Sequence, residues 1–193
     1  MEVDVSKPKI LVFAGSLRKE SLNKKLARAA GRYAEAAGAE VTYLDLADYP
    51  LPIYDGDIES ASGLPENALK LKQILAAHDG FILSSPEYNG GISGVLKNTI
   101  DWVSRPLEGE PSMAAFKDKW VALLAASPGA LGGIRALPMV RTILSGIGCV
   151  MMPEQVALGQ ANKVINAEGA ITDEAAASRV QRLSERLVRF AAK

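Results

Sequence analysis

The stretch KILVFAGSLRKESLN, residues 9–23, contains a strand-like and a loop-like segment in one run. Residues 9–14 are almost all apolar, as in a strand that is covered on both faces of a parallel sheet. Glycine, hydroxyls, charges and an amide follow, and from Leu22 apolar residues recur at helical spacing as far as Ala37. The stretch therefore predicts a buried strand, a polar loop and a helix that Gly38 ends.

The same alternation continues along the rest of the chain, where apolar runs predict strands and helical periodicities separate them. The predicted strands are residues 9–14, 40–44, 80–84, 120–125 and 149–152. The predicted helices are residues 22–37, 66–77, 93–105, 134–144 and 172–190. This alternation indicates an α/β protein, a flavodoxin-like three-layer sandwich with a five-stranded parallel sheet of order 2-1-3-4-5.

Some features of the pattern bear on the organisation of the chain. We expect one domain over residues 1–193, because no repeat, low-complexity tract or boundary interrupts the pattern. Residues 45–65 form a long connection whose length indicates a functional or interface loop. Pro138 lies inside a helical stripe, so that helix is expected to start late or to kink there.

Charge and composition narrow the function classes. The chain has 22 Lys and Arg and 22 Asp and Glu, so no net charge recruits nucleic acid or an anionic membrane surface. No apolar run has the length of a membrane span, and residues 1–8 lack the features of a signal peptide, so we expect a cytoplasmic protein. Cys149 is the only cysteine and His78 the only histidine, which excludes an internal disulfide and argues against a metal site.

Both of these residues have structural interpretations. His78 stands at a predicted helix end, where a histidine interacts favourably with the helix dipole. Cys149 lies in an apolar run and is expected to be a small core residue. A chain with so few side-chain catalysts depends on a bound cofactor for demanding chemistry, and we therefore expect no catalytic side chain.

Ligands of such a sheet bind beyond the carboxyl ends of the strands, near the switch point between the first and third strands. The loop after the first strand begins with Gly15, which is expected to allow a tight turn. Its candidate ligands are Ser16, Arg18, Ser21, Leu22 and Asn23. An arginine, hydroxyls, an amide and the N–H groups of a starting helix suit a phosphate, a capped and solvated helix start being the alternative.

Two further loops leave the same edge of the sheet. The loop after the third strand has an aromatic ring and two glycines, and its candidate ligands are Pro86, Glu87, Tyr88, Asn89 and Gly90. Its backbone suits the polar edge of a flat heteroaromatic ring, a solvated surface turn being the alternative. The loop after the fourth strand is rich in glycine, which permits close approach to the same ring, and its candidate ligands are Ser127, Gly129, Gly132 and Gly133. A phosphate beside a flat ring is the outline of FMN.

These loops resemble those of a known family, the NADPH-dependent FMN reductases, which include bacterial chromate and quinone reductases. Residues 15–23 resemble the phosphate loop of that family, residues 86–106 its most specific stretch, and residues 127–133 its third loop. The resemblance covers residues 9–155. Ser93 stands where the family usually has proline, which is a mild change because serine caps a helix well.

The resemblance implies a homodimer or homotetramer that holds FMN non-covalently and uses NADPH or NADH as co-substrate. It implies a ping-pong reaction in which flavin N5 accepts hydride and an acceptor is then reduced. The acceptors it implies are small molecules: quinones, free flavin, chromate, and azo or nitro compounds. It also implies interface contacts beside the flavin for Arg105, Arg135 and Glu154, solvated surface charges being the alternative.

Two other functions stay open. A flavodoxin carries electrons without turnover of a substrate, but such carriers are typically acidic and have no arginine in the phosphate loop. A flavin-sensing interaction protein would bind FMN without turnover. A phosphoacceptor receiver domain shares the sheet order, but it needs acidic residues where this chain has Gly15-Ser16 and Ser84-Ser85, so it is excluded.

Overall fold

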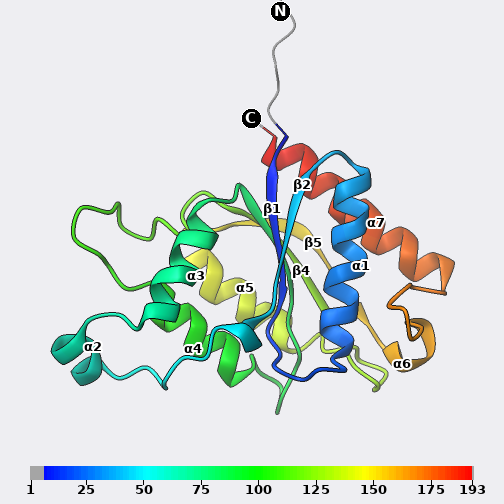
Figure 1. Ribbon diagram of the computed structural model, residues 1–193. Coiled ribbons are helices and arrows are strands. Elements are labelled where there is room, and N and C mark those ends of the chain that lie inside the picture. Colours follow the sequence, from blue (N-terminus) through cyan, green and yellow to red (C-terminus); the bar gives the residue numbers. More distant parts are fainter. Residues whose placement is uncertain (1–6, 193) are drawn as a thin grey trace, which may run out of the picture.

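The computed structural model describes residues 7–192, which form a five-stranded parallel sheet between two layers of helices (Figure 1). The strands are β1 Lys9–Ala14, β2 Glu40–Leu44, β3 Gly80–Ser84, β4 Trp120–Ala126 and β5 Val150–Leu158. Their order is β2-β1-β3-β4-β5, and every neighbouring pair is parallel. The predicted flavodoxin-like sheet and its order are therefore confirmed.

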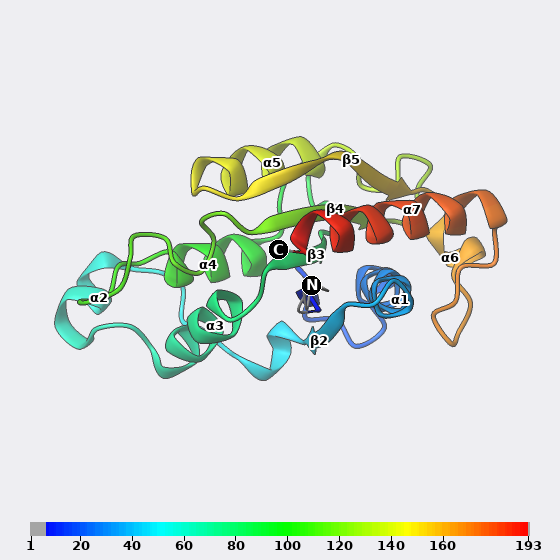
Figure 2. The same ribbon diagram turned by 90° about the horizontal axis from the view of Figure 1, so that it is seen from above.

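The helices lie on both faces of this sheet. They are α1 Leu22–Ala36, α2 Gly56–Ser62, α3 Glu66–Ala76, α4 Gly94–Val103, α5 Ala136–Gly146, α6 Ala161–Val164 and α7 Glu174–Ala191. The view along the strands shows α1 and α7 on one face and α3, α4 and α5 on the other (Figure 2). No helix among residues 7–192 is both long enough and apolar enough to span a bilayer.

Strand β1 shows how the core is divided between the two faces. Ile10 and Val12 pack into the cluster under α1 and α7, whereas Leu11 and Phe13 pack into the cluster under α3, α4 and α5. Successive side chains of a strand point to opposite faces, so burial on both sides requires an uninterrupted apolar run. This is why residues 9–14 lack the polar alternation of a strand with one solvated face.

Strand β5 differs from the prediction, because it extends to Leu158 and is not the short strand of residues 149–152. Its register with β4 shifts between Val121 and Leu123, so the segment that contains Pro153 bulges out of the pairing. Proline is tolerated at a bulge of an edge strand, since no ladder hydrogen bond is lost there. The charged and proline residues that interrupt the apolar pattern therefore lie inside the strand.

The other differences concern irregular segments. Helix α5 starts at Ala136, later than the stripe suggests, so Pro138 falls in its first turn, where its missing N–H costs nothing. The connection 45–65 contains a 3-10 turn, Leu46–Asp48, and the unpredicted helix α2. Trp102 and Asn98 of α4 anchor this connection, because Trp102 Nε1 and Asn98 Nδ2 each donate to the Pro52 carbonyl at 2.8 Å.

The single histidine and the single cysteine have structural contacts. His78 is buried after the end of α3, and its Nδ1 donates to the Ile74 carbonyl at 2.6 Å. Cys149 is buried, and its thiol contacts the Phe116 carbonyl at 3.3 Å. Burial raises the pKa of the Cys149 thiol to about 12, against a small opposing effect of Lys119. A thiol with such a pKa is not a nucleophile at neutral pH.

Candidate functional site

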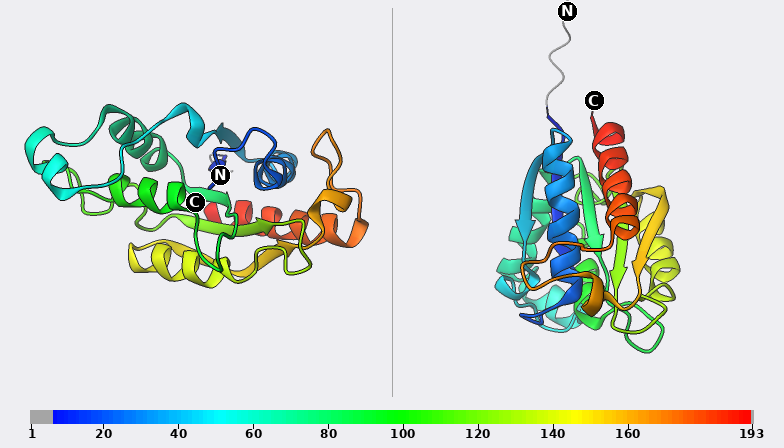
Figure 3. Two further views of the ribbon diagram at one scale, coloured as in Figure 1. Left: turned by 90° about the horizontal axis from the view of Figure 1, so that it is seen from below. Right: turned by 90° about the vertical axis from the view of Figure 1, so that its right-hand side faces the viewer.

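The three candidate loops meet at the carboxyl ends of the strands, the lower edge of the sheet in Figure 1 and the near side in the left view of Figure 3. They enclose a cleft of about 140 Å³. Nine predicted residues line it: Ser16, Arg18, Ser21, Leu22, Asn23, Pro86, Glu87, Tyr88 and Ser127. Glu20, Ala126 and Pro128 complete the lining and were not singled out from the sequence.

The first loop supplies donors at one end of the cleft. Ser21 is the N-cap of α1, and its side chain accepts from the Lys24 backbone N–H at 3.3 Å, which leaves the hydroxyl proton to donate. Ser16 is buried, and its hydroxyl accepts from the Arg18 N–H at 3.3 Å. The N-terminus of a 15-residue helix, with its positive dipole end, therefore opens into the cleft beside Arg18.

Asn23 has a structural role that the sequence did not reveal. Its side chain is buried; Oδ1 accepts from the Ala126 N–H at 3.0 Å and from the Ser84 hydroxyl at 2.8 Å. Nδ2 donates to the Ala126 carbonyl at 3.0 Å. This one amide joins the start of α1 to the ends of β3 and β4, so one of its two N–H groups is already engaged and its first role is to hold the loops together.

Position 15 requires glycine because of close packing, and not because of the tight turn expected from the sequence. Its φ is not positive, but a Cβ there would lie 2.9 Å from the Leu96 side chain. Ser93 caps α4 by accepting from the Leu96 N–H, and its hydroxyl donates to the Gly15 carbonyl at 2.7 Å. The N-terminus of α4 therefore lies directly against the first loop and supports it.

The second loop is a tight hairpin. Tyr88 and Gly91 exchange two backbone hydrogen bonds of 3.1 and 3.0 Å across Asn89 and Gly90. Both of these central residues have positive φ, 54° and 77°, as a two-residue type I′ turn requires, and Asn-Gly is a preferred pair for it. The turn gives Asn89 and Gly90 a conformational reason for their identity, and it holds the half-exposed ring of Tyr88 at the cleft.

Glu87 connects the second loop to the start of α5. Its carboxylate accepts from the Arg135 backbone N–H at 2.9 Å and from Arg135 Nε at 2.6 Å, and it pairs with the remainder of that guanidinium. Burial opposes ionisation of Glu87, but the hydrogen bonds and charge of Arg135 outweigh it, so the pKa of this carboxyl is lowered. Glu87 is therefore a carboxylate that serves as a cap for α5.

The glycines of the third loop separate into two groups. Gly132 and Gly133 are buried with positive φ, and a Cβ on Gly132 would lie 2.6 Å from the backbone nitrogen of Gly159. A Cβ on Gly133 would lie 3.0 Å from the side chain of Ala125. The close approach predicted for these two glycines is thus to the chain itself. Gly129 is exposed, and a Cβ there would meet Ser127 Oγ at an ordinary 3.7 Å.

The three charges considered for an interface all have partners within the chain. Arg135 pairs with Glu87, and Glu154 pairs with Arg186 of α7. Arg105 donates to the Asp101 carbonyl at 3.2 Å and lies 5.3 Å from the centre of the Tyr54 ring. None of them is simply a solvated surface charge, and their expected place at an interface stays a prediction.

The charges in the cleft leave one cation in excess. Glu20 pairs with Lys25 at 3.1 Å, and Glu87 pairs with Arg135, so both carboxylates of the lining are compensated. Among residues 7–192, no acidic side chain pairs with Arg18, which is exposed at the cleft. Hydroxyls, a helix N-terminus and an uncompensated guanidinium at one end, with an aromatic ring and a hairpin at the other, fit a phosphate-bearing flat ring such as FMN.

The comparisons with known proteins agree with this geometry. The family model described as NADPH-dependent FMN reductase matches residues 8–163. A quinone reductase of Pseudomonas putida is 36% identical over 167 residues, 86% of this chain and 85% of that protein. A quinone reductase of Escherichia coli is 32% identical over 174 residues, 87% of each chain.

The solved structures lead to the same group of proteins. FerB of Paracoccus denitrificans, a flavoenzyme described as an NAD(P)H:acceptor oxidoreductase, aligns with a TM-score of 0.80 and 32% identity over 95% of this chain and 97% of its own. An archaeal flavodoxin, with a TM-score of 0.58 and 13% identity, shares the fold. The chain therefore belongs to the NADPH-dependent FMN reductase family, and it is a flavodoxin-like oxidoreductase that uses FMN and NAD(P)H.

Proposed function

We propose that the cleft between the three loops holds FMN and that the chain reduces quinones at the expense of NADPH or NADH. Arg18, the hydroxyls of Ser16 and Ser21 and the first N–H groups of α1 bind the phosphate. The excess positive charge at Arg18 carries this assignment, because both carboxylates of the cleft are compensated. When bound, FMN supplies the exchange of two electrons between a nicotinamide and an acceptor.

The protein groups around the ring bind and orient, and none of them is assigned an acid–base role. The titratable side chains of the lining are Arg18, Glu20, Glu87 and Tyr88, and both carboxylates are engaged in ion pairs. The hairpin 88–91 presents backbone groups to the polar edge of the ring, and Tyr88 forms a wall beside it. The chain therefore places two substrates in turn against one bound ring, which suits a ping-pong cycle.

Quinones are the proposed principal acceptors because the curated relatives of this chain carry that name. Free flavins, azo and nitro compounds and chromate form the wider proposed range, since an open cleft without acid–base groups selects acceptors mainly by size and redox potential. A panel of these acceptors, assayed with NADPH and with NADH, ranks them. Reduction of the other acceptors without any reduction of quinones would contradict the assignment of quinones as principal acceptors.

The experiment that tests the flavin site is removal of the Arg18 charge. Arg18→Ala is expected to weaken FMN binding by at least about tenfold, as expected for loss of a charge-assisted contact to phosphate. Arg28→Ala, at an exposed arginine on α1 outside the cleft lining, serves as the matched control and should bind FMN normally. Affinity is measured by quenching of FMN fluorescence, and unchanged affinity in Arg18→Ala would refute the phosphate assignment.

A visible spectrum separates a reductase from the two other flavoprotein functions. The FMN-loaded chain, desalted and made anaerobic, should lose its yellow colour within seconds of adding NADPH. Retained flavin that stays oxidised would instead favour an electron carrier or a flavin sensor.

The proposal also includes assembly into a homodimer or homotetramer. Several apolar side chains are exposed in the second and third loops and on α5: Tyr88, Leu131, Ile134 and Met139. A group of exposed apolar residues next to a ligand cleft is typical of an interaction surface. Light scattering that shows a monomer at micromolar concentration would exclude this part of the proposal.

A further inference from the structure

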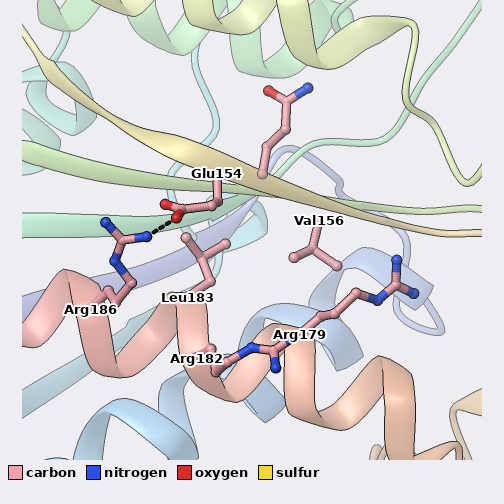
Figure 4. A pocket seen from close by; sticks show the side chains of 7 residues that line it. Glu154, Val156, Arg179, Arg182, Leu183 and Arg186 are labelled. Carbon is pink, nitrogen blue, oxygen red and sulfur yellow. Dashed lines mark ion pairs between the residues drawn. The ribbon is translucent and has the colours of Figure 1, made fainter.

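A second cavity lies between the edge strand β5 and helix α7 (Figure 4). Its volume is about 270 Å³, and it shares no lining residue with that cleft. Val156 and Leu183 are buried, and they form an apolar floor between strand and helix. Arg179, Arg182 and Arg186, at positions i, i+3 and i+7 of α7, lie on one face of the helix and line the cavity. We call this cavity the β5–α7 groove.

The groove carries a net positive charge. Arg186 pairs with Glu154 at one end, as the dashed line in Figure 4 shows. Among residues 7–192, no acidic side chain or hydrogen-bond acceptor is paired with the guanidinium of Arg179 or of Arg182. The chain as a whole is neutral, so two uncompensated cations over one apolar floor are a local property of this groove.

One of the arginines that line the groove also has an unsatisfied donor. Nε of Arg186 is buried without a hydrogen-bond partner, and among the described residues it is the one buried side-chain polar atom in that condition. A buried donor without an acceptor costs free energy, so the pairing of Arg186 with Glu154 leaves this guanidinium incompletely satisfied. The donors that the groove offers to a ligand are the unpaired guanidinium groups of Arg179 and Arg182.

The edge strand itself is a poor docking site for another strand. The register shift between Val121 and Leu123 makes β5 bulge at Pro153, which has no N–H to donate. Bulges and prolines are features that block pairing with a further strand. Recognition in the groove therefore depends on side chains and not on the backbone of β5.

We infer that the β5–α7 groove is a binding site for a small amphipathic anion, with a flat or extended apolar body and a carboxylate, sulfonate or phosphate group. The apolar body lies on Val156 and Leu183. The anionic group accepts from Arg179 and Arg182, whose planar forks match such oxygens in pairs. The site requires no flavin.

Calorimetric titration of the FMN-loaded chain tests the inference, since bound flavin fills the other cleft. The probe is naphthalene-2-sulfonate, and 2-naphthylmethanol is its neutral counterpart. We expect one sulfonate bound per chain, with the neutral compound binding at least about tenfold more weakly.

Two double variants locate the site. Arg179→Gln with Arg182→Gln should lower the affinity for the sulfonate at least about tenfold, which is about 1.4 kcal/mol. Arg28→Gln with Lys117→Gln removes the same charge from exposed positions outside both cavities and should leave the affinity unchanged. Absence of one-to-one binding, equal affinity for the neutral compound, or an equal loss in both variants would each overturn the inference. The FMN content of the same samples reports separately on the flavin site.

Discussion

The flavin cleft and the β5–α7 groove both bind anions in our proposals, but they are built in different ways. The cleft is made of three loops whose buried groups, such as Asn23 and Ser93, hydrogen-bond to the backbone of neighbouring loops. The groove is made of long side chains that extend from one helix over an apolar floor. The cleft is therefore coupled to the stability of the fold, whereas the groove is added to a surface that folds without it.

The two sites differ in what their polar side chains do: those of the cleft mainly hold the loops in place, whereas those of the groove mainly supply charge. In the cleft, most polar groups are engaged with the chain, and a single excess cation faces the ligand. In the groove, Arg179 and Arg182 are uncompensated and exposed, so their replacement costs little folding energy. Substitutions in the two regions should consequently differ in their effect on the free energy of unfolding, and the predictions below run from the largest such effect to the smallest.

The largest loss of stability is expected for Gly132→Ala. The residue has a φ of +64°, and the new Cβ would lie 2.6 Å from the backbone of Gly159. Strain and overpacking together should lower the free energy of unfolding by about 3 kcal/mol. Gly129→Ala, three residues earlier in the same loop, is the control; its Cβ would make only an ordinary contact with Ser127 Oγ, so stability should change by less than about 0.5 kcal/mol. Urea denaturation measures the free energy of unfolding of both variants. Equal values would show that the close packing of Gly132 does not contribute to stability.

The next largest effect is expected for Asn23→Leu. The change conserves volume but leaves the Ala126 N–H and carbonyl and the Ser84 hydroxyl buried without the Asn23 side chain as partner. The free energy of unfolding should fall by about 2 kcal/mol. FMN binding should also weaken, because the start of α1 loses its attachment to β3 and β4.

Asn162→Leu, at an exposed position of α6, is the control for Asn23→Leu and should be close to neutral. Thermal unfolding and FMN titration measure the two effects. Wild-type stability in Asn23→Leu would mean that the three loops are held together by other contacts.

A smaller effect with a distinct pH dependence is expected for Glu87→Gln. The pKa of Glu87 is lowered in the folded chain, so its ionised form contributes stability above the unfolded pKa, and this contribution is lost as the pH falls through the folded pKa. The variant should be less stable than the wild type by about 1 kcal/mol at pH 7. The difference should shrink in acid, below a pH of about 4.

Denaturation curves at pH 7 and in acid test the role of Glu87. Glu168→Gln, which replaces an exposed carboxylate outside the cleft lining, is the reference. A stability difference between Glu87→Gln and wild type that persists unchanged in acid would contradict an ionised Glu87 capping α5.

The smallest effect on stability is expected for Arg179→Gln with Arg182→Gln. Neither guanidinium has an ion-pair partner among residues 7–192, so the free energy of unfolding should change by less than about 0.5 kcal/mol. A loss above 1 kcal/mol in urea denaturation would show that these arginines hold α7 against β5, and the contrast between the two regions would fail.

Individual elements show how far the sequence predicts the structure. Strands β1, β2 and β3 have the predicted bounds, because each is an uninterrupted run that either lies inside the sheet or is bounded by clear turn signals. Strand β5 was predicted too short, because a proline at a bulge of an edge strand has the same appearance in sequence as a strand end. Helix α2 has no buried residue and therefore no apolar periodicity by which to recognise it.

The candidate site was predicted to a similar degree. Clusters of hydroxyls, glycines and an arginine after apolar runs locate the loops, and the parallel topology brings them to one edge. The roles within the loops were less visible. Whether Gly132 approaches a ligand or the chain, and whether Glu87 is solvated or caps α5, depends on neighbours that are distant in sequence.

The sequence by itself determined the fold class, the family and the position of the flavin loops, because apolar periodicity, strand–helix alternation and local motifs are properties of contiguous residues. Only the tertiary structure decided which polar groups face the cleft and which are engaged with the chain, as Asn23 illustrates. It also brought Glu154 and Val156 of β5 beside the arginines of α7. The physical reason is that hydrogen-bond satisfaction and charge compensation are determined by distances in space, and the packing of the sheet against its helices sets those distances.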